Sequence, residues 1–213
     1  MPGATGGDGE RRGRGIAQAS DAARDGGAAQ YSGAVTEAQA PARAERPYTV
    51  RPARTGDVRG ILDLLDPWVQ RRILLGKELV TLFESVQEFV VAEIDGRLIG
   101  CGALHVMWED LGEIRTLIVA EDWLHHGVGG AIVARLEEQA RALGLTRLFC
   151  LTFEVEFFSR RGFTEIGEQV VDPDVYSQLL RSPDEGVAEF LDLAHVKPNT
   201  LGNTRMLKTL EGA

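Results

Sequence analysis

The stretch His126-Gly-Val-Gly-Gly-Ala131 lies between a segment typical of a strand, residues 113–119, and a segment typical of a helix, residues 127–143. Glycines at such a junction allow a tight turn and leave several backbone N–H groups unpaired at the start of the helix. These groups, together with the partial positive charge of a helix N-terminus, favour a bound anion and above all a phosphate. The candidate phosphate-binding residues are therefore His125, His126, Gly127, Val128, Gly129 and Gly130.

Two familiar nucleotide-binding motifs do not fit this stretch. A P-loop requires Gly-Lys-Ser/Thr after four spacer residues, and that sequence is absent. A dinucleotide-binding fingerprint requires a third glycine where Ile132 stands, although Glu154 lies roughly where a ribose-binding acid is expected. A purely structural alternative is that Gly127 and Gly129 only allow a helix to pack closely on a strand.

The segments around the turn predict a mixed sheet. Alternating apolar residues predict strands at 48–54, 88–94, 97–107, 113–119, 147–153 and 163–166, and Asp95-Gly96 is a strong hairpin turn signal. Apolar spacing predicts a helix from Val58 that Pro67 interrupts, and a second helix over about 78–88. It also predicts a helix over about 127–143, with Leu143 on its apolar face, and a short helix that ends at Gly162. The order predicts an α/β fold (an α+β mixed sheet), mostly antiparallel, with a central parallel strand–helix–strand unit and helices on both faces.

Composition excludes several classes of function. The chain has 213 residues, of which 44% are hydrophobic, and a net charge of −9, which argues against a nucleic-acid partner. It contains no apolar run long enough for a membrane span, so no membrane partner is expected. Cys101 and Cys150 are expected to be buried free thiols without zinc-ligand spacing, which predicts a cytoplasmic protein with no metal.

The first 47 residues differ from the rest of the chain. They are rich in Gly and Ala and poor in large apolar residues, so residues 1–47 are predicted to be a disordered tail and residues 48–213 the folded domain. Six arginines and six acidic residues balance in the tail. The whole net charge of −9 therefore belongs to the domain.

The domain resembles the GNAT acetyltransferase superfamily over residues 48–167. Leu124-His-His-Gly-Val-Gly129 occupies the place of the family's Arg/Gln-x-x-Gly-x-Gly/Ala motif, which cradles the pyrophosphate of acetyl-CoA. Phe157-Phe-Ser-Arg-Arg-Gly-Phe163 looks like the family's Leu-Tyr-x-x-x-Gly-Phe segment. The resemblance implies acetyl-CoA as co-substrate. Leu124 departs from the usual Arg or Gln, and Phe158 replaces a Tyr that protonates the leaving thiolate in many relatives.

A closer resemblance is to the short bacterial amino-acid acetyltransferases, which are N-acetylglutamate synthases without a kinase domain. It is carried by residues 112–116, 151–154 and 156–158, and by Val196-Lys-Pro-Asn-Thr-Leu-Gly-Asn-Thr-Arg-Met206. It implies acetyl transfer to the α-amino group of glutamate in arginine biosynthesis, with glutamine as a further acceptor. Two alternatives remain open. One is a GNAT enzyme for another amine, such as a protein N-terminus or a polyamine, and the other is a domain that senses acetyl-CoA or an amino acid without turnover.

The same resemblance implies roles for individual residues. Glu113 would be the general base, with an exposed strand-end acid as the alternative. A backbone N–H of Leu117 or Ile118 would stabilise the oxyanion, and Leu117, Ile118 and Val119 would pair with the pantetheine arm as an added strand. Thr152 is the best candidate for a general acid, and a purely structural Thr is the alternative.

The carboxylates of a small-molecule amino acid require cations or amides. The candidates are Arg115, Lys77, Lys197, Arg205 and Asn199. Arg115 alternates with Glu113 along the strand, which places both on one face, and a surface ion pair is the alternative for it. The pair Arg160-Arg161 either reaches the CoA phosphates or is solvated.

Several apolar or aromatic positions are predicted to be buried. These are the histidines His105 and His195 and the phenylalanines Phe89, Phe153, Phe157 and Phe163. Residues 187–193 are apolar and are expected to supply an interface strand if the chain forms a homodimer.

Overall fold

The computed structural model describes residues 48–71, 76–167, 170–193 and 203–211. The predicted tail lies outside the described residues, as do His195, Lys197 and Asn199.

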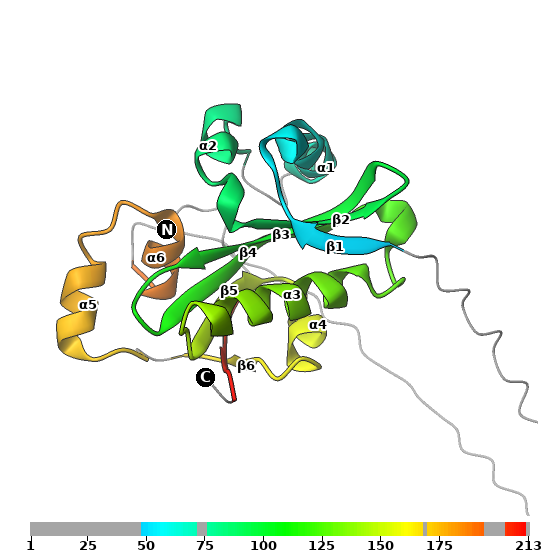
Figure 1. The fold of residues 1–213 in the computed structure, drawn as a ribbon. Helices are drawn as coiled ribbons and strands as arrows, with labels where there is room; N and C mark the ends of the chain where they lie inside the picture. Colours follow the sequence, from blue (N-terminus) through cyan, green and yellow to red (C-terminus); the bar gives the residue numbers. More distant parts are fainter. Residues whose placement is uncertain (1–47, 72–75, 168–169, 194–202, 212–213) are drawn as a thin grey trace, which may run out of the picture. The chain divides into compact units, whose positions relative to one another are not determined.

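The described strands form one sheet in the order β1-β2-β3-β4-β5-β7-β6 (Figure 1). They are β1 (Thr49–Pro52), β2 (Phe89–Ile94), β3 (Arg97–Val106), β4 (Leu111–Val119), β5 (Arg147–Thr152), β6 (Thr164–Glu165) and β7 (Thr204–Thr209). Neighbouring strands are antiparallel except β4 and β5, which are parallel and are connected through a helix. The predicted mixed sheet with a central parallel unit is therefore confirmed.

Helices pack on both faces of this sheet (Figure 1). They are α1 (Val58–Gln70), α2 (Leu79–Glu84), α3 (Val128–Ala142), α4 (Val155–Ser159), α5 (Pro173–Leu179) and α6 (Glu185–Phe190), with short 3-10 turns at Thr55–Asp57, Val86–Glu88 and Glu121–Trp123. One apolar cluster joins α3 and α4 to the sheet, and a second joins α1 and α2 to β2, β3 and β4. A third cluster joins α5 and α6 to β4 and β5.

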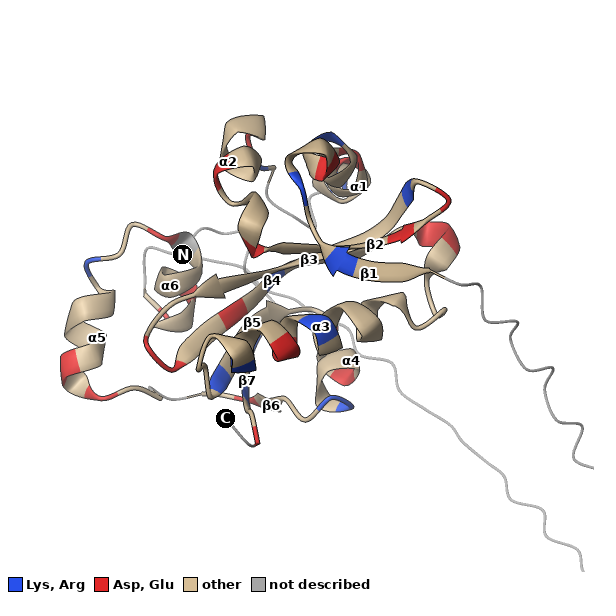
Figure 2. Ribbon diagram, in the orientation of Figure 1, with Lys and Arg blue, Asp and Glu red and all other residues tan. Residues whose placement is uncertain are grey.

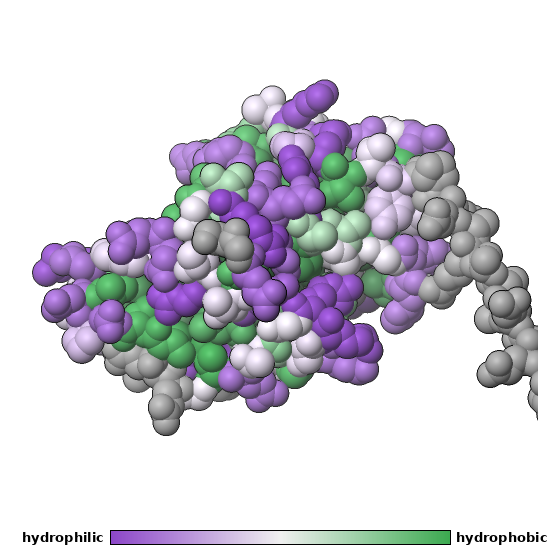
Figure 3. Space-filling model, turned by 60° about the horizontal axis from the view of Figure 1, so that its bottom comes forward, coloured by the Kyte–Doolittle hydropathy of each residue, from purple (hydrophilic) through white to green (hydrophobic). Residues whose placement is uncertain are grey.

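Two glycines in β3 explain how closely α3 approaches the sheet. A Cβ at Gly102 would lie 2.8 Å from a methyl of Ile132, and a Cβ at Gly100 would lie 2.9 Å from another atom of the same side chain. Hydrophilic residues cover most of the face that comes forward in Figure 3, with apolar areas between them. Among the described helices, none combines the length and the apolar composition that a membrane crossing requires.

Three local predictions were wrong. Pro67 does not interrupt α1, which continues to Gln70, because a proline in the last turn removes only one backbone donor while Ile61 and Leu65 hold the helix on the core. Leu143 is 62% exposed because it follows the last helical residue of α3, beyond the buried face. Phe153 is 50% exposed because β5 ends at the preceding residue.

Residues 187–193 do not form the predicted interface strand. Residues 185–190 form helix α6, whose N-cap Asp184 accepts hydrogen bonds from the backbone N–H groups of Gly186 and Val187. The apolar side chains of this segment serve the core, since Phe190 packs edge-on against Phe149 with the ring centroids 5.1 Å apart.

Candidate active site

Strands β4 and β5 diverge in the middle of the sheet. They pair only where residues 111–113 meet Arg147, Leu148 and Phe149. Beyond Glu113, the side of β4 that faces β5 has no strand partner among the described residues. Thr116 lies in this stretch with a φ of 57°, a left-handed conformation that interrupts the regular strand. The open edge at Leu117, Ile118 and Val119 can therefore pair with an extended ligand, as an added strand would.

The glycine turn opens α3 beside this edge. Gly127 is the N-cap with a φ of 83°, a conformation that favours glycine, and Ala131 donates the first hydrogen bond of the helix to its carbonyl. The N–H groups of residues 128–130 come before that bond, so they are placed to meet an anion. Gly129 also serves packing, because a Cβ there would lie 3.3 Å from the ring of Phe157.

The side chains next to the glycine turn supply little charge. Leu124, at the position where the family has Arg or Gln, is partly exposed. Nδ1 of His126 lies 3.1 Å from the carbonyl oxygen of Leu124, and its ring packs against Trp123. His125 has a left-handed backbone with a φ of 63°. The turn thus offers mainly backbone N–H groups.

Glu113 on β4 is buried, with 4% of its surface exposed. Its Oε2 has no hydrogen-bond partner among the described residues, and α6 lies directly on it, since a Cβ at Gly186 would overlap the carboxylate. Burial raises the pKa of Glu113 to about 7, against the opposing charge of Arg115. A carboxylate with this pKa can take up and release a proton near neutral pH.

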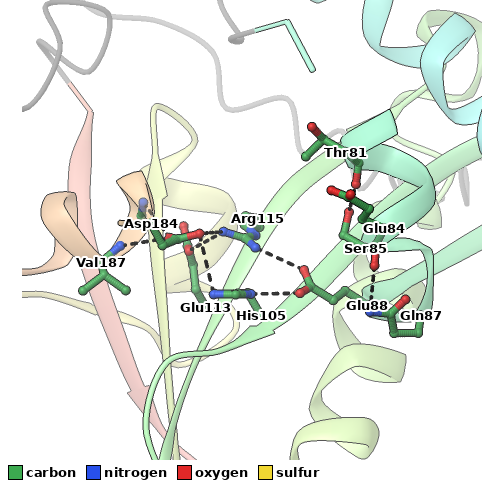
Figure 4. Close-up of polar contacts among 11 residues, drawn as sticks. Thr81, Glu84, Ser85, Gln87, Glu88, His105, Glu113, Arg115, Asp184 and Val187 are labelled. Carbon is green, nitrogen blue, oxygen red and sulfur yellow. Dashed lines mark hydrogen bonds and ion pairs between the residues drawn. The ribbon is translucent and has the colours of Figure 1, made fainter. Parts of the chain in front are cut away.

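Charged side chains from β3, β4, the turn Val86–Glu88 and the start of α6 surround Glu113 (Figure 4). Arg115 places Nη1 2.9 Å from Oδ2 of Asp184 and 3.7 Å from Oε2 of Glu113, and it places Nη2 3.1 Å from Oε2 of Glu88. His105 places Nδ1 2.9 Å from Oε1 of Glu88 and Nε2 3.7 Å from Oδ2 of Asp184. We call these five residues the charged cluster. It joins the turn that follows α2, through Glu88, to the start of α6, through Asp184.

The pKa values within the charged cluster follow from its burial and its contacts. Burial pushes the pKa of Glu88 upward, and the hydrogen bond with His105 and the charge of Arg115 outweigh it and lower that pKa. The pKa of Asp184 falls in the same way, because burial is outweighed by Arg115. Lys77 is close enough to be affected: burial and the charge of Arg115 lower its pKa, opposed by the carboxylates of Glu113, Asp184 and Glu88.

The structure brings together some of the predicted residues and not others. Lys77 and Arg115 converge on Glu113, as the alternation along the strand predicted for Arg115. Arg205 is held elsewhere: its guanidinium donates to the carbonyl of Phe190 and lies 3.8 Å from Asp192. Thr152 is buried at the end of β5, where its Oγ1 accepts a 2.9 Å hydrogen bond from the N–H of Glu154.

Sequence reasoning missed three members of the charged cluster. His105 was predicted to be a core histidine, but it is half-buried and paired with Glu88, which directly precedes β2 and comes close to His105 because Phe89 of β2 pairs with Ala103 of β3. Asp184 had a usable signal, since an Asp before a short apolar run is a common N-cap. Among the described residues, no group of three His, Cys, Asp or Glu side chains is placed to hold a metal ion.

Comparisons with known proteins identify the family of the chain. The sequence profile of the Acetyltransferase (GNAT) family matches residues 62–163. An amino-acid acetyltransferase of Mycobacterium tuberculosis is 56% identical over 173 residues, which cover 78% of this chain and 99% of that protein. The chain therefore belongs to the GNAT acetyltransferases, and acetyl-CoA is its co-substrate.

A further relative by sequence and two solved structures come from amino-acid acetyltransferases and related proteins. One from Azotobacter vinelandii is 38% identical over 120 residues, which cover 55% of this chain and 28% of that longer protein. A crystal structure of an M. tuberculosis protein in complex with CoA and NLQ has a TM-score of 0.72 and 57% identity, and covers 76% of this chain and 99% of its own. N-acetylglutamate synthase from Neisseria gonorrhoeae, complexed with coenzyme A and N-acetyl-glutamate, has a TM-score of 0.62 and 27% identity, and covers 78% of this chain and 36% of its own.

Proposed function

We propose that the protein transfers the acetyl group of acetyl-CoA to the α-amino group of glutamate, the first step of arginine biosynthesis. The observation that carries the proposal is the buried Glu113, with Arg115 and Lys77 beside it, at the point where β4 leaves β5. The amino-acid acetyltransferases among the relatives and the synthase from N. gonorrhoeae support the choice of acceptor. We place the reaction in the cytoplasm, which the two buried free cysteines support.

Acetyl-CoA is expected to lie along the open edge of β4. The pyrophosphate would rest on the N–H groups of the glycine turn, and the pantetheine arm would pair with Leu117, Ile118 and Val119. The residues present fit this ligand, because the start of α3 lies next to the unpaired edge of β4: a Cβ on Gly129 would lie 3.5 Å from the side chain of Val119.

The chemistry requires three events in this site. Glu113 takes a proton from the acceptor ammonium, directly or through a water, and the free amine attacks the thioester carbon. The oxyanion accepts a hydrogen bond from the N–H of Leu117 or Ile118. The carbon–sulfur bond then breaks, the acetyl group stays on the amine, and CoA leaves as the thiolate. The hydroxyl of Thr152 keeps its proton available for that thiolate, since the contact with Glu154 uses only its acceptor side.

The charges around Glu113 favour glutamine as a second candidate acceptor. When Glu113 is ionised, three carboxylates, those of Glu88, Glu113 and Asp184, face the cations Arg115 and Lys77, and burial lowers the pKa of Lys77. Glutamate brings a second carboxylate into this surplus of negative charge, whereas glutamine brings an uncharged amide. An acceptor with one carboxylate therefore has less repulsion to overcome.

The test is acetyl transfer by the purified protein. The protein is incubated with acetyl-CoA and each amino acid in turn, and free CoA is measured against time. We expect release above background with glutamate, glutamine or both, and none with lysine, a polyamine or a peptide N-terminus. Background rates with both glutamate and glutamine would refute the proposal, and release with a polyamine or a peptide would point to another amine.

A further inference from the structure

The two adjacent arginines after α4 have different surroundings. Basic residues mark the turn after this helix in Figure 2. Arg160 is exposed and forms an ion pair with Glu156 one turn earlier, as a solvated helix charge does. Arg161 is half-buried: its guanidinium lies 3.6 Å from the centre of the Phe157 ring, and Nη1 donates a 2.7 Å hydrogen bond to the Phe157 carbonyl.

Arg161 also reaches the first turn of α3. A Cβ at Gly130 would lie 2.6 Å from Nη2 of Arg161, so the guanidinium covers the third residue of that helix and needs a glycine there. A helix N-terminus carries a partial positive charge, which repels a cation in this position.

The positive charge at Arg161 is poorly compensated. Within the part of the chain that the structure describes, no carboxylate lies within ion-pair distance of Arg161. Burial and the charge of Arg160 lower the pKa of Arg161, and they outweigh the opposing charge of Glu137, which forms its ion pairs with Lys208 and Arg141. A half-buried cation, a neighbouring cation and the N–H groups at the start of α3 thus lie close together, where a bound anion would be stabilised by all three.

We propose that Arg161 binds a pyrophosphate oxygen of acetyl-CoA and supplies the cation that Leu124 lacks. The inference rests on the use of acetyl-CoA and is independent of which amine accepts the acetyl group. The glycine turn donates backbone N–H groups to the phosphate, and Arg161 donates from the α4 side. Stacking on Phe157 fixes the guanidinium before the ligand arrives, which reduces the entropy cost of binding.

The test is CoA binding by titration calorimetry without any acceptor. Arg161→Gln should weaken binding at least about tenfold, equivalent to about 1.4 kcal/mol. The matched control is Arg160→Gln, which removes the same charge from the neighbouring residue and should change binding less than about twofold. Arg161→Lys should keep part of the affinity, because it retains a charge but loses the planar fork.

Dephospho-CoA separates the pyrophosphate from the 3′-phosphate. If Arg161 contacts the pyrophosphate, Arg161→Gln should lose the same factor with dephospho-CoA as with CoA. If Arg161→Gln weakens the binding of CoA but not of dephospho-CoA, Arg161 contacts the 3′-phosphate, and the assignment to the pyrophosphate is overturned.

A merely structural role predicts a different pattern. In that case Arg161→Gln would lower the melting temperature, and its deficit in CoA binding would not change with salt. A direct contact predicts a deficit that shrinks as salt screens the charge. Equal affinity of Arg161→Gln and the unchanged protein would overturn the proposal. If Arg161→Gln does not fold, the test is made with Arg161→Lys. The proposal is then overturned if Arg161→Lys binds CoA with the same affinity and the same salt dependence as the unchanged protein.

Discussion

Replacing Glu113 by glutamine should destroy activity and stabilise the protein at the same time. The variant removes the proposed base, so the rate near neutral pH should fall at least about tenfold. It also removes a charge from a buried site. Burial raises the pKa of Glu113 from the ordinary 4.5 to about 7, and a difference of this size corresponds to about 3 kcal/mol of folding free energy.

The sign follows from the direction of the shift. The pKa of Glu113 is higher in the folded state than in the unfolded chain, so its contribution to stability is fully present below about pH 4.5. That contribution is lost as the pH rises to about 7, because the carboxylate must then ionise in a buried site. About 2 kcal/mol of the loss falls between pH 5.5 and pH 8.

Urea unfolding of both proteins at pH 5.5 and pH 8 measures this difference. Glu113→Gln should gain about 2 kcal/mol over the unchanged protein between the two pH values. The control is Glu156→Gln, an exposed position whose variant should show no such gain. If the stabilities of Glu113→Gln and the unchanged protein differ by the same amount at both pH values, Glu113 does not have a raised pKa and the reasoning fails.

The turnover rate at saturating acceptor should rise about tenfold from pH 6 to pH 8, because only ionised Glu113 accepts a proton; a flat profile would exclude it from proton transfer. Asp184→Asn should move this rise to lower pH, since the charge of Asp184 raises the pKa of Glu113. The same variant should raise kcat/KM for glutamate relative to glutamine, and an unchanged ratio would contradict the charge argument. Gly186→Ala should lower kcat about a hundredfold, because the added Cβ would displace the Glu113 carboxylate. Gly127→Ala should destabilise the fold by about 1 kcal/mol in urea unfolding and weaken CoA binding in calorimetry, since its φ of 83° is strained for alanine.

Most of the sheet could be predicted because its signals are local. The turn at Asp95-Gly96 has both residues at positive φ, as the sequence predicted, and Gly144 ends α3 with a φ of 83°. The wrong predictions of burial concern the ends of helices and strands, where the first residue beyond the element no longer faces the core. Leu143 and Phe153 both continue an apolar pattern past the last residue of their element, and both are exposed.

The site could be predicted only where one strand carries it. Glu113 and Arg115 alternate along β4, so the sequence alone places them on one face. His105 and Glu88 come close because β2 pairs with β3. Asp184 lies at the start of α6, 69 residues beyond its partner Arg115. Such pairings depend on tertiary packing, which no local pattern encodes.

The acidic composition of the chain has different consequences at the two ends of the site. A protein with a net charge of −9 that binds anionic CoA must gather its cations locally. At the proposed acceptor end, Arg115 already pairs with Asp184 and Glu88, so little positive charge is left for a second carboxylate of the acceptor. At the proposed CoA end, Arg161 has no ion-pair partner among the described residues, although the charge of Glu137 acts on it from a distance. If the proposed site is correct, this difference in ion pairing directs the polyanionic donor and the amino-acid acceptor to different halves of it.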